Sequence, residues 1–593
     1  MNKLSKKSGR VAGRLAKKIN QSTSRAVEHV KDVFVGRLDN AHKVRGKIIA
    51  WVMIMVALIF CAGLQYMWYR STHTTMAFVS GGGFAEATLG RVDNLNPLFV
   101  STNSEQVIAR LVFSGLYKHD TSGSVRADLA RGMSVSEDEL VYDVTLRSGV
   151  KWHDGVALSA EDVVYTVEVM RDPRSRTILH AKWQDVEVEK LDEYTVRFRL
   201  PSPYAAFYEM LTFAVLPSHI LGGVSNEQLR EDSFGMNPIG TGPFEFRTMR
   251  ASGGGSGRIV YLVANERYHK GRPKLDRFSV HAFETREEIL HAMNTARVNA
   301  TAELTAADEA ELRMDRINVR EAMVNSGVFA FLNTRSDALQ DTRVRRAVRH
   351  SIDMSEVREE LKGAAPLDLP ILASQVRFEL PDFRDQFNRE RAAELMSEAG
   401  FLVREGRLVN EEGEQLRLRI ATIASDNFVK VANSMAAQLV AAGFAVEVNV
   451  GELGGGMGGQ NFLQNVLMVR DYDILIYEIE MGPDPDVFPF YHSSQRGTGG
   501  LNLSEFSNIV VDDLLVSARA TLDNEVRRVK YEAFLNRWIS DVPAIGVFQT
   551  KAVYYYNRNA RVFSEDSRLV TSMDRFADVI YWATVRGRVH RTP

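Results

Sequence analysis

The stretch LVYDVTLRSGVKWHDGVALSAEDVVYTVEVMRDP (Leu140–Pro173) contains the patterns of a strand, a turn and a helix in succession. Its first seven residues alternate between apolar and polar side chains, which is typical of a strand with one buried face. Asp154-Gly155 has the composition of a turn. Ala160–Met170 has helical spacing, and Ser159 before it, with an acidic residue three positions later, is a helix-starting pattern. The stretch therefore predicts mixed α/β structure.

The same two patterns alternate along the chain from about residue 76 to the C-terminus. Further strands are predicted at Tyr194–Leu200, Gly443–Val450 and Tyr472–Ile479. Further helices are predicted at Thr285–Thr295, Thr342–Ile352, Asn388–Ala399 and Lys430–Ala442. Gly400 and Gly443 follow the last two helices, as a left-handed cap requires. The sequence contains no internal repeat of about 20–50 residues, so the pattern favours an α/β fold over a solenoid or propeller.

The N-terminal region differs from the rest in charge and hydropathy. Residues 1–47 hold thirteen Lys or Arg residues and three acidic residues, and Ile48–Tyr69 is a run of 22 residues without a formal charge. A helix of that length spans about 30 Å, the thickness of the hydrocarbon core of a bilayer. We therefore expect a basic cytoplasmic arm at 1–47 and a transmembrane anchor helix at 48–69. The acidic remainder is expected outside the cytoplasm, because basic flanks stay inside.

A cleaved or lipidated leader is disfavoured by the same region. The basic part and the apolar run are both longer than a signal peptide allows. Phe60 precedes Cys61, where a lipoprotein signal would have a small residue. Within the arm, residues 27–38 fit either an amphipathic helix on the inner leaflet or a disordered basic tail, and the sequence leaves both open.

The composition argues against several classes of protein. The folded body is acidic once the arm is set aside, whereas nucleic-acid binding needs positive charge on the folded domain. The chain has one cysteine, Cys61, which excludes an intramolecular disulfide and a cysteine-based zinc site.

Two local motifs invite a catalytic or nucleotide-binding interpretation. His153 and Asp154 are adjacent, so on a strand their side chains point to opposite faces, and a structural role is favoured. Gly454, Gly456 and Gly459 satisfy G-x-G-x-x-G, but such a match arises easily in a glycine-rich run. Neither motif supplies a nucleophile with a base and an orienting partner, and the sequence contains no H-E-x-x-H. We therefore predict no catalytic residues, no metal site and no cofactor, and a protein that is not an enzyme.

Ordered motifs from Asn96 to about Tyr556 carry a resemblance to a known family. The motifs are Asn96-Pro97-Leu98, VFSGLYKHDTSG (Val112–Gly123), the opening stretch Leu140–Pro173, PIGTGPFEF (Pro238–Phe246), ERYHKGRPKLDRFSV (Glu266–Val280), FAFLNTR (Phe329–Arg335), VRRAVRHSID (Val344–Asp353) and YDILIYEIEMGPDPDVF (Tyr472–Phe488). In order and spacing they resemble the family 5 extracellular solute-binding proteins, which bind oligopeptides, dipeptides, nickel complexes and some sugars.

The resemblance implies an α/β, two-lobed fold of the periplasmic-binding-protein type, type II, in the large peptide-binding subclass. By analogy, lobe one is 76–328 plus 548–593, and lobe two is 329–547. The chain is expected to cross between the lobes near Ser326–Phe331 and near Val547–Tyr554, where a few dihedral changes would absorb hinge closure.

The resemblance also indicates where a ligand would bind. In the peptide-binding members, the peptide lies extended between the lobes, and an aspartate in one loop holds its α-ammonium group. Tyr477–Asp486 corresponds to that region, with Met481 at the position of the aspartate. Glu480 is adjacent and could supply the charge or be a solvated loop residue, and the acids in Pro483–Asp486 could be turn residues. The ligand contacts implied are Tyr477, Glu478, Ile479, Glu480, Met481, Asp484 and Asn96.

The function implied by the resemblance is capture of a solute for uptake. A single-pass membrane protein, with a cytoplasmic N-terminus and an extracellular or periplasmic binding domain, would take up peptides or similar small solutes. It would deliver them to the permease subunits of an ABC importer with its ATPase. The expected partners are therefore the solute, the permease and the membrane, and not nucleic acid. A ligand-sensing receptor module without transport is the alternative, slightly favoured by the long arm because transport needs only an anchor.

Overall fold

The structure of the chain is a computed structural model, which describes residue 28 and residues 45–252, 257–361, 364–381, 387–451 and 462–590. It divides into two compact units, described separately below. One consists of Met1–Phe78 with Arg586–Pro593, and the other is Val79–Val585. The basic arm apart from residues 28 and 45–47, and the motif Gly454–Gly459, lie outside the described residues.

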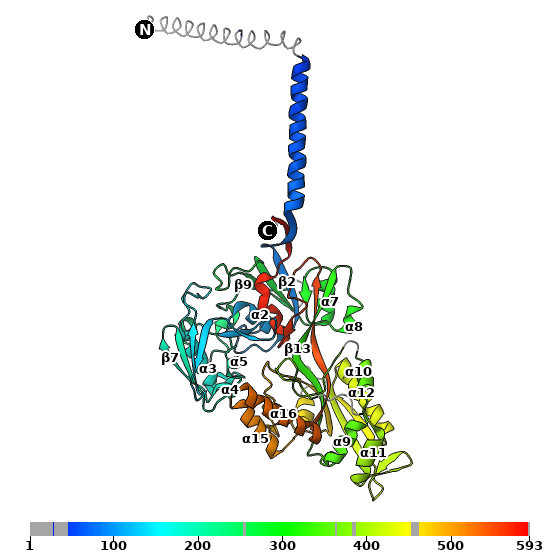
Figure 1. The fold of residues 1–593 in the computed structure, drawn as a ribbon. Helices are drawn as coiled ribbons and strands as arrows, with labels where there is room; N and C mark the ends of the chain where they lie inside the picture. Colours follow the sequence, from blue (N-terminus) through cyan, green and yellow to red (C-terminus); the bar gives the residue numbers. More distant parts are fainter. Residues whose placement is uncertain are drawn as a thin grey trace, which may run out of the picture. The chain divides into compact units, whose positions relative to one another are not determined.

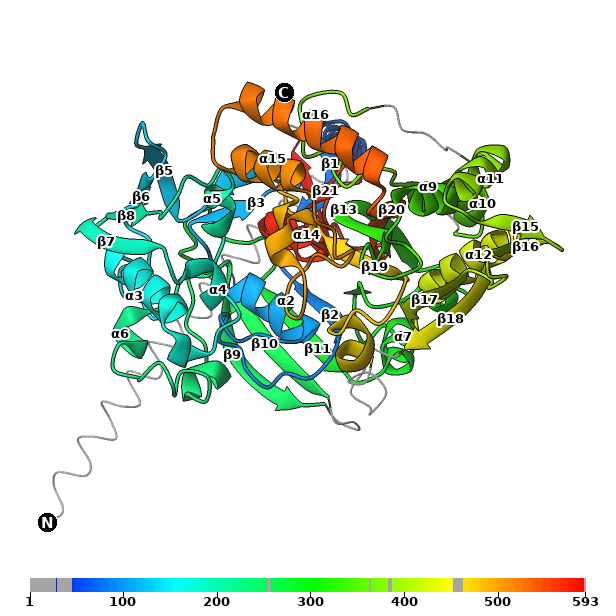
Figure 2. The same cartoon turned by 90° about the horizontal axis from the view of Figure 1, so that it is seen from below.

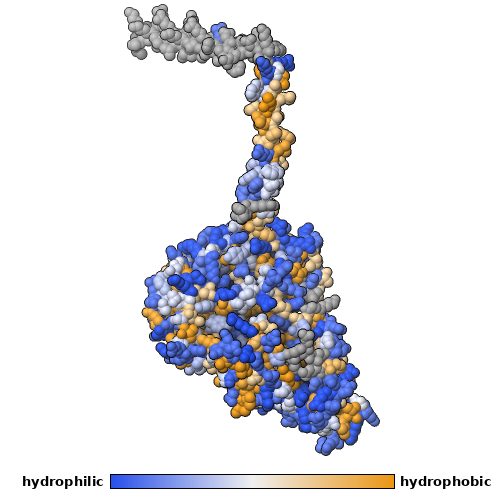
Figure 3. Space-filling model, in the orientation of Figure 1, coloured by the Kyte–Doolittle hydropathy of each residue, from blue (hydrophilic) through white to orange (hydrophobic). Residues whose placement is uncertain are grey.

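The first unit contains a continuous helix, Arg45–His73, which extends beyond both ends of the predicted anchor. It is long and apolar enough to cross a membrane, and none of its most apolar segment is buried in the protein. Figure 3 shows apolar side chains covering much of this helix. The same unit holds the pairing of strand β1 (Thr74–Val79) with strand β22 (Val585–His590).

The second unit is built on a large mixed sheet that contains twelve strands in the described part of the chain. The strands lie in the order β18 (Ala445–Gly451), β17 (Arg417–Ile423), β19 (Ile474–Glu480), β13 (Ile317–Leu332), β20 (Ala544–Asn557), β12 (Ala300–Thr301), β2 (Gly83–Leu89), β11 (Arg277–Phe283), β10 (Arg258–Ala264) and β9 (Phe244–Ala251). Two short strands complete it, β14 (Ala365–Pro366) on β20 and β21 (Arg568–Leu569) on β13.

A smaller antiparallel sheet has the order β5 (Ala130–Val135), β6 (Val141–Leu146), β8 (Thr195–Arg199) and β7 (Glu187–Asp192). The principal helices are α2 (Asn103–Val112), α3 (Ala160–Arg171), α5 (Phe207–Met210), α7 (Arg286–Asn294), α9 (Thr342–His350), α10 (Met354–Glu359), α11 (Arg389–Glu398), α12 (Asp426–Ala441), α14 (Phe488–Tyr491), α15 (Ile509–Arg519) and α16 (Asn524–Asp541). Figures 1 and 2 show α3 beside the small sheet, and α9–α12 at the other end of the unit with β17 and β18.

The predicted α/β pattern is confirmed by these elements. Each strand and helix predicted from the sequence has a counterpart, and helix α3 begins with the expected capping box of Ser159 and Asp162. Gly400 and Gly443 follow α11 and α12 with φ of 93° and 100°, in the left-handed region. Helix α12 begins at Asp426, four residues before the prediction.

Strands β13 and β20 form the longest pairing of the sheet, antiparallel from Ile317 opposite Asn557 to Phe331 opposite Ala544. The register is interrupted between Met323 and Gly327. There the backbone of Asn325 has other partners: its N–H donates to Val570 O at 3.0 Å, and its carbonyl accepts from Met481 N at 2.7 Å.

The hydrophobic core changes at this interruption. Two clusters of buried residues draw on the chain up to Val324 and again from Tyr554 onward. Two others lie entirely between Val328 and Phe548. The two long strands therefore connect two separately packed regions of apolar side chains.

Candidate ligand-binding site

The predicted site lies where β19 runs alongside β13 and leads into the loop of residues 481–486. In the register, Glu480 stands opposite Ser326, next to the interruption in β13. Of the predicted contacts, residues 477–481 are therefore brought to the junction between the two core regions.

Glu478 links the strands at this junction. Its Oε1 accepts a hydrogen bond from Thr550 Oγ1 of β20 at 2.8 Å and a short one from Ser326 Oγ of β13. Tyr477 is half-buried, and its burial raises the pKa of its hydroxyl. Ile479 is buried and belongs to the apolar cluster behind β19.

Glu480 and Met481 have opposite environments. The side chain of Glu480 is exposed, and it has no hydrogen-bond or ion-pair partner among the residues that the structure describes. Met481 is only 3% exposed and packs in the same apolar cluster as Ile479. A Cβ placed on Gly327 would lie 3.2 Å from Met481 Cε, which shows how closely this side chain approaches strand β13.

The two acids of the Pro-Asp-Pro-Asp loop are paired with arginines. Asp484 is buried and accepts from Arg527 Nη2 of α16 at 2.5 Å. Asp486 accepts from Arg519 Nη2 of α15 at 2.7 Å, and its other oxygen accepts from Phe488 N in a turn at 3.2 Å. Asp486 is therefore both a turn residue and an ion-pair partner, whereas Asp484 is an ion-pair partner.

A segment from the other core region contacts this loop. Tyr204 Oη donates to Asp486 Oδ2 at 3.3 Å, and Ala205 N donates to Arg519 O at 2.8 Å. Glu209 of α5 lies against Gly482, where a Cβ would be 2.9 Å from Glu209 Oε2. Figures 1 and 2 both show α5 beside α15.

We call Tyr204, Glu209, Asp484, Asp486, Arg519 and Arg527 the carboxylate–arginine cluster. Burial, followed by the charges of Asp484 and Asp486, raises the pKa of Glu209 to about 9. The sequence did not predict Tyr204, Glu209, Arg519 or Arg527, because they lie far apart in the chain and no local pattern marks them.

Asn96 is placed apart from these contacts in a turn of its own. It is fully buried, its Oδ1 accepts from Leu98 N at 3.2 Å, and its N–H donates to Asn94 Oδ1 at 2.8 Å. Its Nδ2 is buried without a hydrogen-bond partner in the described structure. The ligand-contacting role of all seven predicted residues remains a prediction.

The adjacent His153 and Asp154 lie in a turn and not on a strand, and their side chains have different partners. The His153 ring accepts from Gly240 N at 3.2 Å and lies 3.1 Å from Gly242 O, and burial lowers the pKa of this imidazole to about 4. Asp154 instead bonds His219 Nε2 at 2.8 Å. His153 therefore fastens the turn at Gly240–Gly242, and His153 and Asp154 do not form a joint acid–base site.

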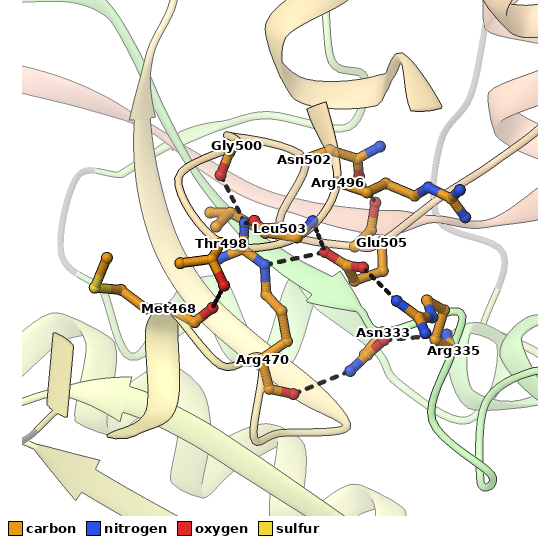
Figure 4. Close-up of polar contacts among 12 residues, drawn as sticks. Asn333, Arg335, Met468, Arg470, Arg496, Thr498, Gly500, Asn502, Leu503 and Glu505 are labelled. Carbon is orange, nitrogen blue, oxygen red and sulfur yellow. Dashed lines mark hydrogen bonds and ion pairs between the residues drawn. The ribbon is translucent and has the colours of Figure 1, made fainter. Parts of the chain in front are cut away.

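A concave region of about 610 Å³ lies at the amino ends of β17, β18 and β19. Figure 4 shows how the polar side chains beside it bond to one another. Arg470 and Arg335 both pair with the buried Glu505, at 3.2 and 3.3 Å. Because ligands of open α/β sheets bind at the carboxyl ends of parallel strands, the junction at the end of β19 is the stronger candidate.

The comparison with protein families decides the assignment. Residues 124–500, more than half of the chain, match the model of the bacterial extracellular solute-binding proteins, family 5. The chain belongs to this family. It is a family of two-lobed solute-binding proteins and not one of enzymes.

Individual relatives extend over most of the chain. The oligopeptide-binding protein AppA of Bacillus subtilis (strain 168) is 25% identical over 518 residues, which cover 83% of this chain and 91% of AppA. The di/tripeptide-binding protein 2 of Pseudomonas aeruginosa (strain UCBPP-PA14) is 27% identical over 441 residues, covering 69% of this chain and 78% of that protein.

Solved structures share the fold. The substrate-binding protein CtaP of Listeria monocytogenes superposes with a TM-score of 0.73 at 24% identity, covering 85% of this chain and all of CtaP. The B. subtilis AppA structure, which contains a nonapeptide, superposes with a TM-score of 0.66 at 22% identity, covering 86% and 99%. NikZ of Campylobacter jejuni, in complex with Ni(L-His), superposes at 0.69 with 23% identity, covering 84% and 99%.

Proposed function

We propose that this protein is the membrane-anchored solute-binding component of an ABC importer. It captures a peptide or a similar small solute between its two lobes and delivers it to the permease and its ATPase. The observation that carries the proposal is membership of family 5 together with two core regions joined by the paired strands β13 and β20. The names of the relatives, an oligopeptide-binding and a di/tripeptide-binding protein, support a peptide as the solute.

The proposed lobes are 76–328 plus 548–593 for lobe one and 329–547 for lobe two. The division of the apolar clusters supports these bounds to within one residue, since in the described structure no cluster holds residues from both sides of the boundary, except that Val328 and Phe548, at the boundary itself, pack with lobe two. The interrupted register at Met323–Gly327 supports a hinge there, because the two long strands are not paired with each other over this segment and a few dihedral changes could absorb a closure.

The proposed anchor is the helix Arg45–His73, in a single-pass topology with a cytoplasmic N-terminus. Its length of 29 residues exceeds what a bilayer core of about 30 Å requires. Two aromatic residues near its C-terminal end, Trp68 and Tyr69, suit a membrane interface. The binding domain is then extracellular or periplasmic, as in the family.

The proposed ligand contacts are Tyr477, Glu478, Ile479, Glu480, Met481, Asp484 and Asn96. Among the acids, Glu480 is the best candidate to hold a positively charged group, because it is exposed and its charge has no partner in the described residues. Glu478 already accepts hydrogen bonds from hydroxyl groups, and Asp484 is already paired with an arginine. Ile479 and Met481 would contact the solute through main-chain groups, since their side chains are buried.

The experiment uses the full-length chain in lipid nanodiscs. Ligands that co-purify are identified by native mass spectrometry, and defined peptides are titrated by calorimetry into the wild type and Glu480→Gln. We expect peptide binding, weakened about tenfold or more in Glu480→Gln for a ligand with a free amine. Glu412→Gln, an exposed acid in a distant turn, serves as the control and should bind as the wild type does. Absence of any co-purified or titrated peptide ligand would overturn the peptide assignment.

A further inference from the structure

The contact between α5 and the loop 482–486 places carboxylates of both lobes next to one another. Glu209 belongs to lobe one, and Asp484 and Asp486 belong to lobe two. Beside them, Tyr204 Oη and Ala205 N make direct hydrogen bonds to Asp486 and Arg519 of the opposite lobe. The structure therefore has its two lobes closed upon each other at this cluster.

The charges at the cluster do not balance when every acid is ionised. Asp484 and Asp486 have one arginine each, Arg527 and Arg519, at 2.5 and 2.7 Å. Glu209 has no basic partner of its own among the described residues, and its Oε1 is buried without a hydrogen bond. Three carboxylates thus meet two guanidinium groups, which leaves one negative charge in a partly dehydrated contact.

The other groups that face Glu209 do not compensate for this charge. Tyr208 and Tyr204 are uncharged hydroxyls whose pKa values burial raises. The backbone N–H of Asp484 and the charge of Arg527 favour ionised Glu209, but burial and the two aspartates outweigh them. Asp484 is itself held by Arg527, against burial that raises its pKa.

We propose that closing the two lobes takes up one proton, which is bound by the side chain of Glu209. This rests on the proposed function only in so far as the lobes open and close. An uncharged Glu209 removes the repulsion from Asp484 and Asp486 and allows the buried contact with Gly482. When the lobes separate, Glu209 is returned to water and releases the proton.

The direction of the pH dependence follows from the two states. In the closed form the pKa of Glu209 is about 9, and in water a glutamate returns to its ordinary value of 4.5. Between these values the closed form holds a proton that the open form lacks. The closed-to-open ratio therefore falls about tenfold for each pH unit of increase within this window, and it levels off above and below it.

The test measures lobe closure directly in ligand-free, full-length protein in nanodiscs. In a Cys61→Ser background, spin labels are attached to cysteines replacing Ile178 and Ile509, which are 86% and 77% exposed and lie on opposite lobes. Pulsed electron–electron double resonance then measures the distances between the two labels, which give the closed and open populations from pH 5.5 to 8.5. Glu209→Gln is compared with Glu139→Gln, whose Oε2 accepts from Leu522 N across the lobes at 2.9 Å.

We expect the closed population to fall with rising pH in the parent protein and in Glu139→Gln. In Glu209→Gln it should be high and independent of pH. An unchanged pH slope in Glu209→Gln, an open Glu209→Gln at every pH, or a parent without a pH slope would each overturn the proposal. Because the protein is ligand-free, failure of the peptide assignment leaves this result unaffected.

Discussion

Arg527 of α16 donates to Asp484 at 2.5 Å, which ties the loop after β19 to the helix pair α15–α16. Both side chains are largely buried, at 12% and 3% exposed. The ion pair therefore fixes the loop that carries the candidate site, and each partner depends on the other to remain charged away from water.

Breaking this pair should destabilise the protein. Arg527→Met leaves the Asp484 carboxylate buried without its counterion, at a cost of about 3–5 kcal/mol in the free energy of unfolding. The double variant Asp484→Asn/Arg527→Met should recover most of that loss, because it removes both charges. Urea unfolding followed by tryptophan fluorescence measures the loss in Asp484→Asn, in Arg527→Met and in the double variant, and additive losses would contradict the coupling.

A buried aspartate in lobe one should make stability depend on acid pH. Burial raises the pKa of Asp574, but the bond from His119 and the charge of Arg110 outweigh it and lower this pKa to about 2, against an ordinary 3.8. The stabilisation is thus present above about pH 4 and is lost as the pH falls toward 2.

Asp574→Asn should accordingly cost about 2 kcal/mol at pH 7, and less at pH 3, in urea unfolding measured at both values. Asp143→Asn is the control, because Asp143 forms a partly exposed pair with Arg197 and should cost less than about 1 kcal/mol. A difference for Asp574→Asn that does not shrink in acid would argue against the pKa assignment.

The two glycines of the turn Gly240–Gly242 have no room for a Cβ. A Cβ on Gly242 would collide with the backbone of Leu111 and Val112. Gly242→Ala should lower the free energy of unfolding by about 1–3 kcal/mol through this overpacking. Gly132→Ala, with no atom within 4 Å of the added Cβ, should change it by less than half of that.

Much of the fold was predictable because its signals are local. Ser159 and Asp162 mark the start of α3 within four residues, and the alternation of Leu140–Leu146 marks β6. The start of α12 is harder to predict, because Ser425, Asp426 and Asn427 are all residue types that favour an N-cap, and Ser425 at the N-cap makes no side-chain cap bond.

The candidate site was predictable only in part. The loop after β19 was recognised by its resemblance to a family, but the burial of Met481 depends on packing against Gly327 of another strand. The pairing of Asp484 with Arg527, and the approach of Glu209 from lobe one, join residues that only the folded chain brings together. The local pattern of a single sequence carries no information about such contacts.

The helix Arg45–His73 should be required for attachment to the membrane. Removal of residues 1–73 deletes the whole apolar helix and should release the protein from membranes without detergent. Membrane flotation of the full-length and shortened proteins measures this. A shortened protein that still floats with vesicles would show a further membrane attachment.

Calorimetric titration of the full-length protein with defined peptides tests the central claim most directly. We expect saturable binding at one site per chain, with a negative heat-capacity change as the lobes close over the solute. We also expect amine-bearing peptides to bind more weakly to Glu480→Gln than to the wild type. A folded protein that binds no peptide, and from which native mass spectrometry releases no solute, would contradict this claim.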